Sequence, residues 1–452
     1  MIDGLKPYPN YKESGLPWAT KLPSHWKTER AKWLFTKMDR SVQPQDETVT
    51  CFRDGMVTLR KNRRLRGFTE AIFEFGYQGI RKGDLVIHAM DAFAGAVGVS
   101  DSDGKGTPVY LVCEPKDGIN AHYYAFIVRE MARTHWILAL AKGIRERSTD
   151  FRYDAFGGQR VPLLPRDEQE TIVRFLDHAN GRIERAIRAK KKLIGLLNEQ
   201  KQAIIHRAVT RGLDPYVPLK PSGIPWLGDI PKHWEVQRAK YLFREVDERS
   251  KTGKETHLAM SQRLGLVPSD MVESSLRSDS YAGGKLCKEG DLVLNRLKAH
   301  LGVFALANQG GVISPDYSVF RKRASINMEY FESVLRSSAC RRELRIRAKG
   351  IVEGFWRLYT DDFYDIRLPV PPISEQAETM SAIAASTKNL NAAIARTERE
   401  ISLLQEYRTR LTADIVTGQL DVREAATKLA EHSDEAIVKR ASEEDEIVEA
   451  EA

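Results

Sequence analysis

Cysteine is scarce in this chain, and its four cysteines lie far apart. Cys51, Cys113, Cys287 and Cys340 form no C-x-x-C pair, so the sequence indicates neither a disulfide framework nor a zinc site. The ten histidines do not pair at the spacing of metal ligands either. We therefore expect buried free thiols and no bound metal.

Long hydrophobic runs and recognisable catalytic motifs are also missing. No stretch approaches the ~20 apolar residues of a membrane span, and the first residues lack the apolar core of a signal peptide. The chain contains no G-x-x-x-x-G-K-[ST], H-E-x-x-H or G-x-S-x-G pattern. These absences predict a cytoplasmic protein without a membrane partner, and they argue against an enzyme that acts alone.

Basic and acidic residues are unevenly distributed. The 452 residues include 70 lysines and arginines against 62 acidic residues, a net charge of +8. Residues 424–452 contain ten acidic and three basic residues, so the preceding 423 residues carry +15. A basic body of this size predicts a polyanionic partner, most often nucleic acid, although a merely solvated surface would have the same composition. We expect the acidic tail to be disordered.

The main feature of the sequence is an internal duplication. Residues 15–35 and 223–243 read GLPWATKLPSHWKTERAKWLF and GIPWLGDIPKHWEVQRAKYLF, with 11 of 21 positions identical. Further matches follow at an offset of 207 residues: Gly-Asp-Leu-Val at 83–86 and 290–293, Ala-Lys-Gly-Ile at 141–144 and 348–351, and Pro…Glu-Gln at 165–169 and 372–376. Two copies of a unit of about 200 residues therefore make up most of the chain.

Each repeat is predicted to begin as a mixed α+β globule and to end as a long helix. Short β-rich runs, at 84–88, 109–113, 291–294 and 317–320, lie between glycine-rich turns. Residues 167–210 and 374–417 contain no proline, and a proline precedes each of them, as helix starts prefer. The predicted order is target globule 1–165, spacer helix 166–212, target globule 213–372, spacer helix 373–423 and acidic tail 424–452.

The apolar positions of both predicted helices advance by four and three residues, as in a coiled-coil seam. They are Ile183, Ile187, Ile194, Leu197 and Ile204 in the first helix, and Leu390, Ile394, Ile401, Leu404, Leu411 and Ile415 in the second. Lys190 and Lys201 interrupt the first series, and Thr397 and Arg408 interrupt the second at matching places. These polar residues either fix the register of the pair or pack their stems sideways with their heads in water.

The length of the helices predicts their relative direction. Forty-four residues at ~1.5 Å each give roughly 66 Å, whereas a compact globule of about 150 residues is about 35 to 40 Å across. Such a globule could not carry the chain back along a parallel pair, so we expect antiparallel helices and globules related by a pseudo-twofold axis. Duplex DNA offers the same symmetry to two readers of half-sites about 34 Å apart.

Basic residues in both repeats are candidates for contacts with DNA phosphates or base edges. The candidates are Arg53, Arg60, Arg63, Arg64 and Arg66 in the first repeat and Arg263, Arg296 and Lys298 in the second. Lys142, Arg152, Lys349 and Arg357 lie in or after the duplicated Ala-Lys-Gly-Ile. A charged run is often only a solvated face, and a structural role for the glycine of this motif is the competing interpretation.

The duplicated Gly-[Leu/Ile]-Pro-Trp…Pro-x-His-Trp…Arg-Ala-Lys segment, with the Gly-Asp-Leu-Val and Pro…Glu-Gln repeats, resembles the specificity subunit of type I restriction-modification enzymes over residues 7–423. The resemblance implies two target recognition domains that each read one half of a bipartite DNA target, joined by antiparallel helices. It also implies two modification subunits, which bind S-adenosylmethionine and methylate adenine, and restriction subunits that use ATP and Mg²⁺. This chain itself would be non-catalytic and would bind no cofactor.

Two other functions stay open on the sequence alone. A self-contained DNA-modifying enzyme would cut or methylate DNA without partners, which the missing motifs argue against. A coiled-coil adaptor would bind only protein, and any DNA binding would lack the steep salt dependence that phosphate contacts cause. The acidic tail departs from the pattern of the family that the chain resembles.

Overall fold

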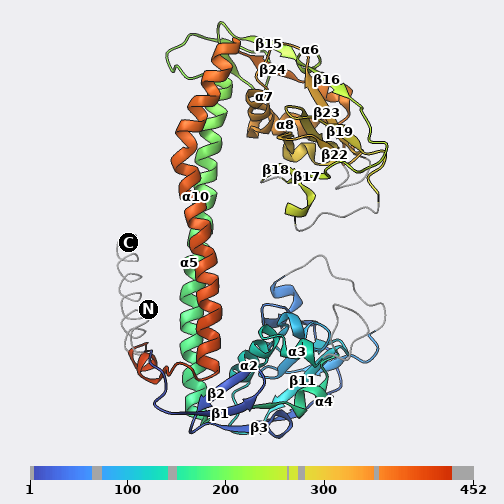
Figure 1. Cartoon of the computed structure of the whole chain (residues 1–452). Helices are drawn as coiled ribbons and strands as arrows, with labels where there is room; N and C mark the ends of the chain where they lie inside the picture. Colours follow the sequence, from blue (N-terminus) through green and yellow to red (C-terminus); the bar gives the residue numbers. More distant parts are fainter. Residues whose placement is uncertain are drawn as a thin grey trace, which may run out of the picture. The chain divides into compact units, whose positions relative to one another are not determined.

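The computed structural model describes residues 5–63, 74–140, 150–261, 264–272, 280–350 and 356–429. The chain divides into two compact units: unit 1 comprises Met1–Arg188 and Ile401–Ala452, and unit 2 comprises Ala189–Glu400. Each unit therefore combines one globule with part of both long helices. Figure 1 shows the order of the elements along the chain by colour.

Unit 1 contains the elements of the first repeat. Its strands are β1 (Tyr11–Leu16), β2 (Ala19–Pro23), β3 (Lys27–Arg30), β4 (Phe35–Lys37), β5 (Val49–Cys51), β6 (Val57–Leu59), β7 (Gln78–Ile80), β8 (Leu85–His88), β9 (Val97–Val99), β10 (Gly104–Gly106), β11 (Tyr110–Pro115) and β12 (Arg160–Leu163). Its helices are α1 (Ala31–Leu34), η1 (Arg60–Asn62), η2 (Ala92–Ala94), α2 (Ala121–Arg133), α3 (Trp136–Ala139), α4 (Tyr153–Gly158) and the start of α5 (Arg166–Arg211).

Unit 2 repeats this order. Its strands are β13 (Leu219–Pro221), β14 (Asp229–Pro231), β15 (Glu235–Arg238), β16 (Phe243–Val246), β17 (Leu258–Ser261), β18 (Gly265–Pro268), β19 (Lys285–Cys287), β20 (Leu292–Asn295), β21 (Phe304–Leu306), β22 (Gly311–Ile313), β23 (Tyr317–Lys322) and β24 (Arg367–Val370). Its helices are α6 (Ala239–Leu242), η3 (Ser269–Met271), η4 (Arg296–Leu301), α7 (Met328–Arg336), α8 (Ser338–Arg347), α9 (Thr360–Tyr364) and the start of α10 (Ile373–Val416).

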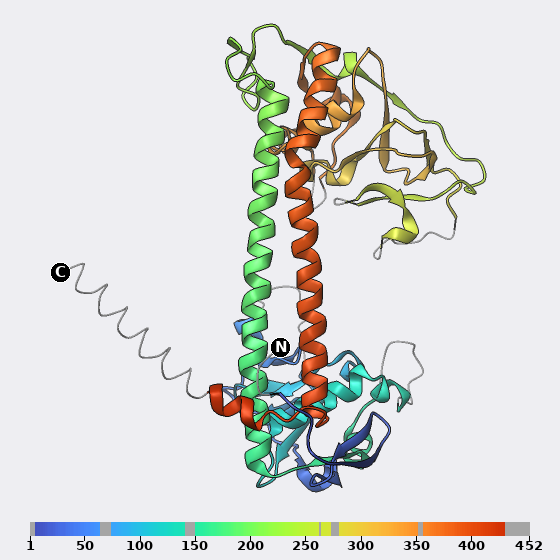
Figure 2. The same ribbon diagram turned by 60° about the vertical axis from the view of Figure 1, so that its left-hand side comes forward.

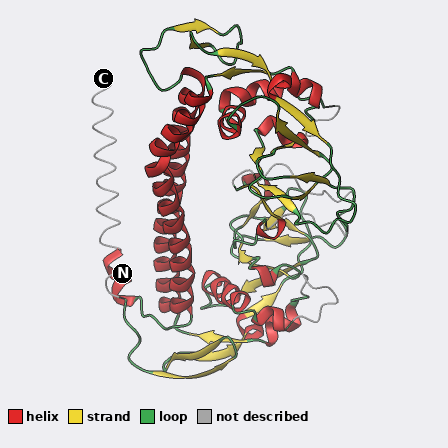
Figure 3. Cartoon of the chain, turned by 45° about the horizontal axis from the view of Figure 1, so that its top comes forward, coloured by secondary structure: helices red, strands yellow, loops and turns green. Residues whose placement is uncertain are grey.

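The two units have the same sheet topology, which confirms the α+β prediction. The central sheet has the order β4-β11-β8-β9 in unit 1 and β16-β23-β20-β21 in unit 2, with antiparallel neighbours throughout. Each unit also contains small two-stranded sheets, and Figure 3 shows the strands of the chain in yellow. All four β-rich runs predicted from the sequence contribute strands to the central sheets.

The duplicated Gly-Asp-Leu-Val segment is a structural turn that leads into the central strand. Gly83 and Gly290 have φ of +95° and +83°, which an L side chain rarely adopts. The next residue closes the turn: Asp84 Oδ2 accepts a 2.7 Å hydrogen bond from Arg81 N, and Asp291 Oδ2 accepts one of 2.8 Å from Lys288 N. The Leu and Val that follow are buried strand residues in both units.

Two long helices, α5 and α10, occupy the predicted segments and lie side by side in Figure 1 and Figure 2. In unit 1 the beginning of α5, with Ile172 and Leu176, shares a core with Leu411 and Ile415 at the end of α10. In unit 2, cores form from the opposite ends of the two helices: Ala208 and Val209 of α5 share one with Ile383 of α10. The helices are therefore antiparallel, as predicted.

The predicted seam positions form the inner face of the helix pair. Ile183, Ile187, Leu411 and Ile415 are buried, and the other seven seam residues are half-buried. By contrast, Leu196 and Leu403, which lie off the seam, are 53% and 63% exposed. Two polar interruptions reach across: Lys190 Nζ lies 2.5 Å from Glu400 Oε2, and Arg408 Nη1 lies 3.8 Å from Glu184 Oε2 of the facing helix. Thr397, which the sequence aligns with Lys190, is buried.

A carboxylate at the start of each long helix anchors the globule to it. In unit 1, Glu168 Oε1 accepts hydrogen bonds from Tyr8 Oη (2.6 Å) and Trp26 Nε1 (3.1 Å), and Glu168 Oε2 lies 3.0 Å from His25 Nε2. In unit 2, Glu375 receives Trp234 Nε1 at 2.9 Å and contacts His233 Nε2 at 2.8 Å. The duplicated Pro-x-His-Trp and Glu-Gln motifs are therefore halves of one structural contact.

Each globule is completed by the end of the helix that belongs to the other repeat. Tyr123 of α2 donates a 3.0 Å hydrogen bond to the Val416 carbonyl at the end of α10. Tyr330 of α7 donates one of 3.1 Å to the Val209 carbonyl near the end of α5. Both tyrosines are buried, so each hydrogen bond satisfies a hydroxyl that water does not reach.

Two further sequence predictions can be compared with the structure. All four cysteines are free and buried, as predicted. The prediction of a disordered tail from residue 424 is wrong for residues 424–429, which are helical and bury Ala425 and Ala426 in the core of unit 1. These alanines supply apolar surface that a purely solvating tail would lack; the remaining tail lies outside the described residues. Across the described ranges, none of the helices combines the length and apolar character that crossing a membrane requires.

Candidate nucleic-acid interface

In unit 2, several predicted DNA-binding residues come together where β20 ends. Arg296 begins η4, and its guanidinium donates to the Asp316 carbonyl (Nε, 2.8 Å) and the Pro315 carbonyl (Nη2, 3.2 Å). Arg357 forms an ion pair with the Asp316 carboxylate. The turn before β23 therefore holds two arginines from distant parts of the sequence.

The duplicated Ala-Lys-Gly-Ile segment lies beside η4. Lys349 and Arg357 exchange backbone hydrogen bonds of 2.9 and 2.8 Å, and Leu358 N donates to the Arg296 carbonyl at 3.1 Å. The Lys349 ammonium is 69% exposed and lies 2.8 Å from Asp362 Oδ1. Lys298 is exposed on η4 itself. These contacts place four of the predicted residues in one basic segment.

The equivalent place in unit 1 follows β8. Phe151 N donates to the Ala89 carbonyl at 3.2 Å, the counterpart of the contact between Leu358 and Arg296. Arg152 comes next and is 70% exposed, beside Asp150. Arg53 Nη2 donates to Asp91 Oδ1 at 3.1 Å from the turn between β5 and β6. We call Arg53 and Arg152 the basic segment of unit 1.

Two other predicted residues of unit 1 follow β6: Arg60 begins η1, and Arg63 comes directly after it. Arg63 Nη1 donates to Asp54 Oδ1 at 2.9 Å, and its guanidinium lies 4.2 Å from the centre of the Phe52 ring. Arg60 Nε lies 3.4 Å from Thr50 Oγ1. Arg64, Arg66, Lys142 and Arg263 lie outside the described residues.

The ion pairs of these arginines are exposed and hold them weakly. Arg53 is 65% exposed and Asp91 29%, and for Arg63 and Asp54 the values are 37% and 52%. Exposed pairs of this kind are worth about 0 to 1 kcal/mol. A phosphate group could therefore replace the carboxylate at small cost, which suits a surface that exchanges internal ion pairs for contacts with a polyanion.

Arg129 of α2 differs from these residues because the described part of the chain offers its guanidinium no hydrogen-bonded acceptor and no ion pair. It lies against Gly55 and Gly95, where an added Cβ at Gly55 would overlap the guanidinium. Burial lowers the pKa of Arg129, and the Asp54 carboxylate opposes that shift only partly. A half-buried guanidinium that has no partner among the described residues, and that lies against the turn between β5 and β6, is suited to binding an anion.

Unit 2 has a similar feature built from a different helix. The side chain of Arg341 in α8 packs over Gly302, which aligns with Gly95 and has φ of +70°. Arg341 Nε is buried and, among the described residues, has no hydrogen-bond acceptor. In both units an arginine that has no carboxylate partner in the described ranges therefore lies against the glycine that ends the turn after the central strand.

Sequence reasoning missed Arg129 and Arg341. For Arg341 a signal existed, because α8 carries four arginines, at 341, 342, 345 and 347, directly before Lys349. For Arg129 no local signal exists, because its α2 neighbours are mostly apolar and its lack of a partner is visible only in the folded unit.

The chemistry of nucleophiles and metals finds little support in the described residues. Burial raises the pKa of the Cys51 and Cys113 thiols to about 12 and that of Cys287 to about 11, so these thiols stay protonated near neutral pH. Burial also raises the pKa of Cys340. Across the described ranges, no three His, Cys, Asp or Glu side chains group as metal ligands.

Comparison with known proteins identifies the fold. No protein-family model matches this chain. A chain from a structure described as "Structural basis underlying complex assembly and conformational transition of the type I R-M system" is 14% identical, with a TM-score of 0.59 over 87% of this chain and 98% of that chain.

Two further structures were found. The HsdS subunit from Thermoanaerobacter tengcongensis is 16% identical, with a TM-score of 0.39 over 87% of this chain and 96% of that chain. The type-I restriction-modification system S subunit from M. genitalium is 13% identical, with a TM-score of 0.34 over 86% of this chain and 96% of that chain. The structure with the TM-score of 0.59 shows that this chain has the fold of a chain from a type I restriction-modification system.

Proposed function

We propose that this chain is the DNA-specificity subunit of a type I restriction-modification system. Each repeat acts as a target recognition domain for one half of a bipartite double-stranded DNA target, and α5 with α10 sets the spacing between them. The chain recruits two modification subunits, and restriction subunits join the same assembly. It performs no chemistry itself.

One observation carries most of this proposal: the same turn in both units, after β8 and after β20, lies beside a basic segment but has different side chains. Ala89 and Asp91 of unit 1 align with Arg296 and Lys298 of unit 2. A common scaffold with different contact residues is what two readers of different half-sites require, because base edges are distinguished by the side chains that meet them.

The division of labour follows from the groups that the chain offers. Its described thiols are buried, and arginines and lysines dominate the candidate interface, so the surface is suited to holding DNA rather than to transforming it. In this proposal S-adenosylmethionine binds to the modification subunits, and ATP and Mg²⁺ bind to the restriction subunits.

Selection from random duplexes tests the proposal. The chain, assembled with its modification subunits, would be incubated with random-sequence DNA and the bound fraction sequenced. We expect two short conserved blocks separated by a spacer of constant length and unconserved sequence. A single continuous block would contradict two separate readers.

The salt dependence of DNA binding separates this function from that of a protein-binding adaptor. Six to ten phosphate contacts would weaken binding by about 10³ to 10⁵ between 50 and 200 mM salt. An adaptor would show no sequence selection and little dependence on salt. Cutting or methylation by the purified chain alone would support a self-contained enzyme instead.

A further inference from the structure

A second surface feature is common to both units and takes no part in the candidate nucleic-acid interface. The duplicated Arg-Ala-Lys-[Trp/Tyr]-Leu-Phe segment forms α1 in unit 1 and α6 in unit 2. The alanine and leucine of each short helix are buried, but the aromatic residue between them points outward: Trp33 is 60% exposed and Tyr241 is 56% exposed.

Basic side chains lie beside each exposed ring. In unit 1, Lys32 Nζ and Lys116 Nζ lie 5.3 and 5.9 Å from the centre of the Trp33 ring. In unit 2, Lys240 Nζ lies 5.0 Å from the Tyr241 ring. Arg323, which aligns with Lys116, donates from Nη1 to the Lys240 carbonyl at 3.4 Å. We name these two groups the aromatic-cation patches: Lys32, Trp33 and Lys116 in unit 1, and Lys240, Tyr241 and Arg323 in unit 2.

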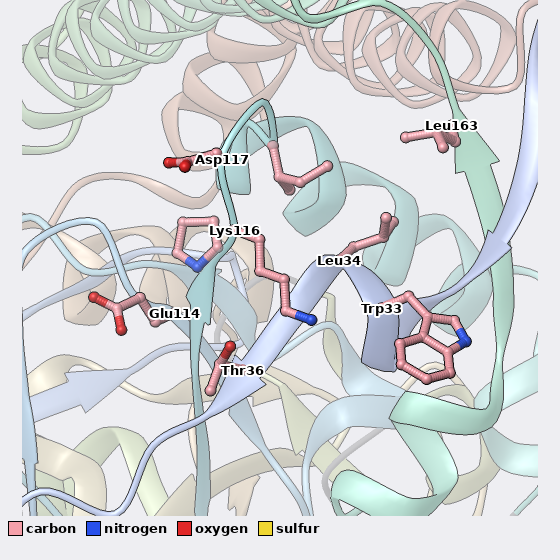
Figure 4. A pocket seen from close by; sticks show the side chains of 9 residues that line it. Trp33, Leu34, Thr36, Glu114, Lys116, Asp117 and Leu163 are labelled. Carbon is pink, nitrogen blue, oxygen red and sulfur yellow. The ribbon is translucent and has the colours of Figure 1, made fainter.

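In unit 1 the patch borders an open hollow of about 780 Å³, whose lining includes Leu34, Ile119 and Leu163. Figure 4 shows Lys116 extending between Glu114 and Leu34 toward Trp33. The acidic residues of this hollow are not shared, because Glu114 and Asp117 align with Arg321 and Ala324. The features that the two patches share are therefore an exposed ring, a lysine beside it and a second basic residue.

The register of the central sheet separates these patches from the basic segments. In unit 1, β11 begins opposite His88, which leads to η2, and ends with Pro115 opposite Phe35, which follows α1. In unit 2, β23 begins with Tyr317 opposite Asn295 and ends with Lys322 opposite Phe243. The patch and the basic segment thus lie at opposite ends of the same strand in each unit.

Likeness between the repeats indicates what kind of partner the patches fit. Surfaces that read different half-sites need different side chains, whereas surfaces that receive two copies of one protein need the same ones. Exposed Trp and Tyr beside Arg or Lys are also typical of the residues that dominate binding energy in protein interfaces. Their cations require carboxylates on the partner, since like charges would repel.

We propose that each aromatic-cation patch docks one copy of the same partner protein, through an apolar recess for the ring and carboxylates around it. We take this partner to be the modification subunit, and in this respect the inference rests on the proposed function. Two equivalent patches on one chain then bind two copies, one at each repeat.

Native mass spectrometry of the full chain co-expressed with its modification subunit tests the inference. Trp33→Ser and Tyr241→Ser should each leave one partner copy bound, and the double variant none. We expect the affinity at the altered site to fall roughly 30-fold or more. Tyr216→Ser removes a 91% exposed tyrosine outside the patches and should leave two copies bound.

A rescue and a DNA measurement keep the outcomes distinct. Exchanging the rings, with Trp33→Tyr and Tyr241→Trp, should keep two copies, because either aromatic serves in one repeat or the other. Two copies retained by the double serine variant would overturn the inference. If that variant also bound DNA more weakly, the patches would be contacting DNA instead of the partner protein. If the wild-type assembly binds two copies but selects no DNA sequence, the proposed function fails instead.

Discussion

Replacing Arg129 by methionine should separate DNA binding from stability. Arg129 is half-buried, and the described residues offer it no hydrogen-bond acceptor, so the desolvation of its charge is only partly offset by the Asp54 carboxylate. Methionine keeps a similar length without the charge, and replacing buried ionic groups with apolar ones is often neutral or stabilising. We therefore expect the free energy of unfolding to stay unchanged or to rise by about 1 kcal/mol.

The effect on DNA binding can be estimated from counterion release. Each phosphate contact contributes about −0.9 to the slope of log K against log salt. When the salt rises from 50 to 200 mM, the affinity of the wild type should therefore fall by a factor about 3.5 times larger than that of the variant, which has lost one contact. Fluorescence anisotropy of the assembled complex on its target duplex, at four salt concentrations, measures this slope.

A matched control lies one turn further along α2. Arg133 is 49% exposed and pairs with Glu130 through hydrogen bonds of 2.7 and 2.5 Å. Arg133→Met should leave the salt slope unchanged. If Arg129→Met instead lowers stability by more than about 2 kcal/mol and leaves the slope unchanged, the guanidinium has a structural role and the reasoning is refuted.

Three other predictions concern the framework. Glu168→Ala leaves buried donors unsatisfied and should lower the free energy of unfolding, measured in urea, by about 3 kcal/mol. Glu375 has one donor fewer and is 22% exposed, so Glu375→Ala should lower it by less. Equal losses in the two variants would contradict this. Removing residues 189–195 and 396–402 together shortens both helices by about 10 Å and keeps the seam in register. The preferred DNA spacer should then become shorter. An unchanged spacer would show that α5 and α10 do not set the spacing between the half-sites. Hydrogen bonds from Lys190 and Arg396 lower the pKa of Glu400, so this carboxylate stabilises the helix pair above its unfolded pKa of about 4.3. That contribution should vanish as the pH falls through the pKa of Glu400 in the folded protein. Thermal unfolding should therefore show a smaller loss of stability at low pH for Lys190→Met than for the wild type.

The framework was accessible to sequence reasoning because it depends on local patterns that occur twice. The absence of proline and the apolar spacing predicted helices at 167–210 and 374–417, within one residue of α5 and α10. The predicted spacer helix 373–423 was too long, because α10 ends at Val416, just before Gly418 with its φ of +71°. The repeated motifs showed that the two globules share one fold. The predicted helices are longer than a globule is wide, and this comparison was enough to predict that they are antiparallel. The core of each unit confirms it, because the beginning of one long helix packs there with the end of the other.

The partners of individual side chains could not be predicted, because they depend on contacts between distant residues. Nothing near Glu168 in the sequence indicates that it receives Tyr8, His25 and Trp26. Similarly, Arg129 has no partner in the part of the chain that the structure describes, because the fold places it over Gly55 while the Asp54 carboxylate is bound to Arg63. The sequence indicated candidate basic residues in both repeats but not which of them would already be paired.

The direct test of two separate readers is the map of methylated adenines in cells that contain the complete system. It would be compared for the wild-type chain and for a chain in which residues 44–160 are replaced by those of a relative. The account predicts a bipartite methylated motif in both cases, with one half changed by the exchange and the other half retained. A single uninterrupted motif, or a change in both halves, would contradict it.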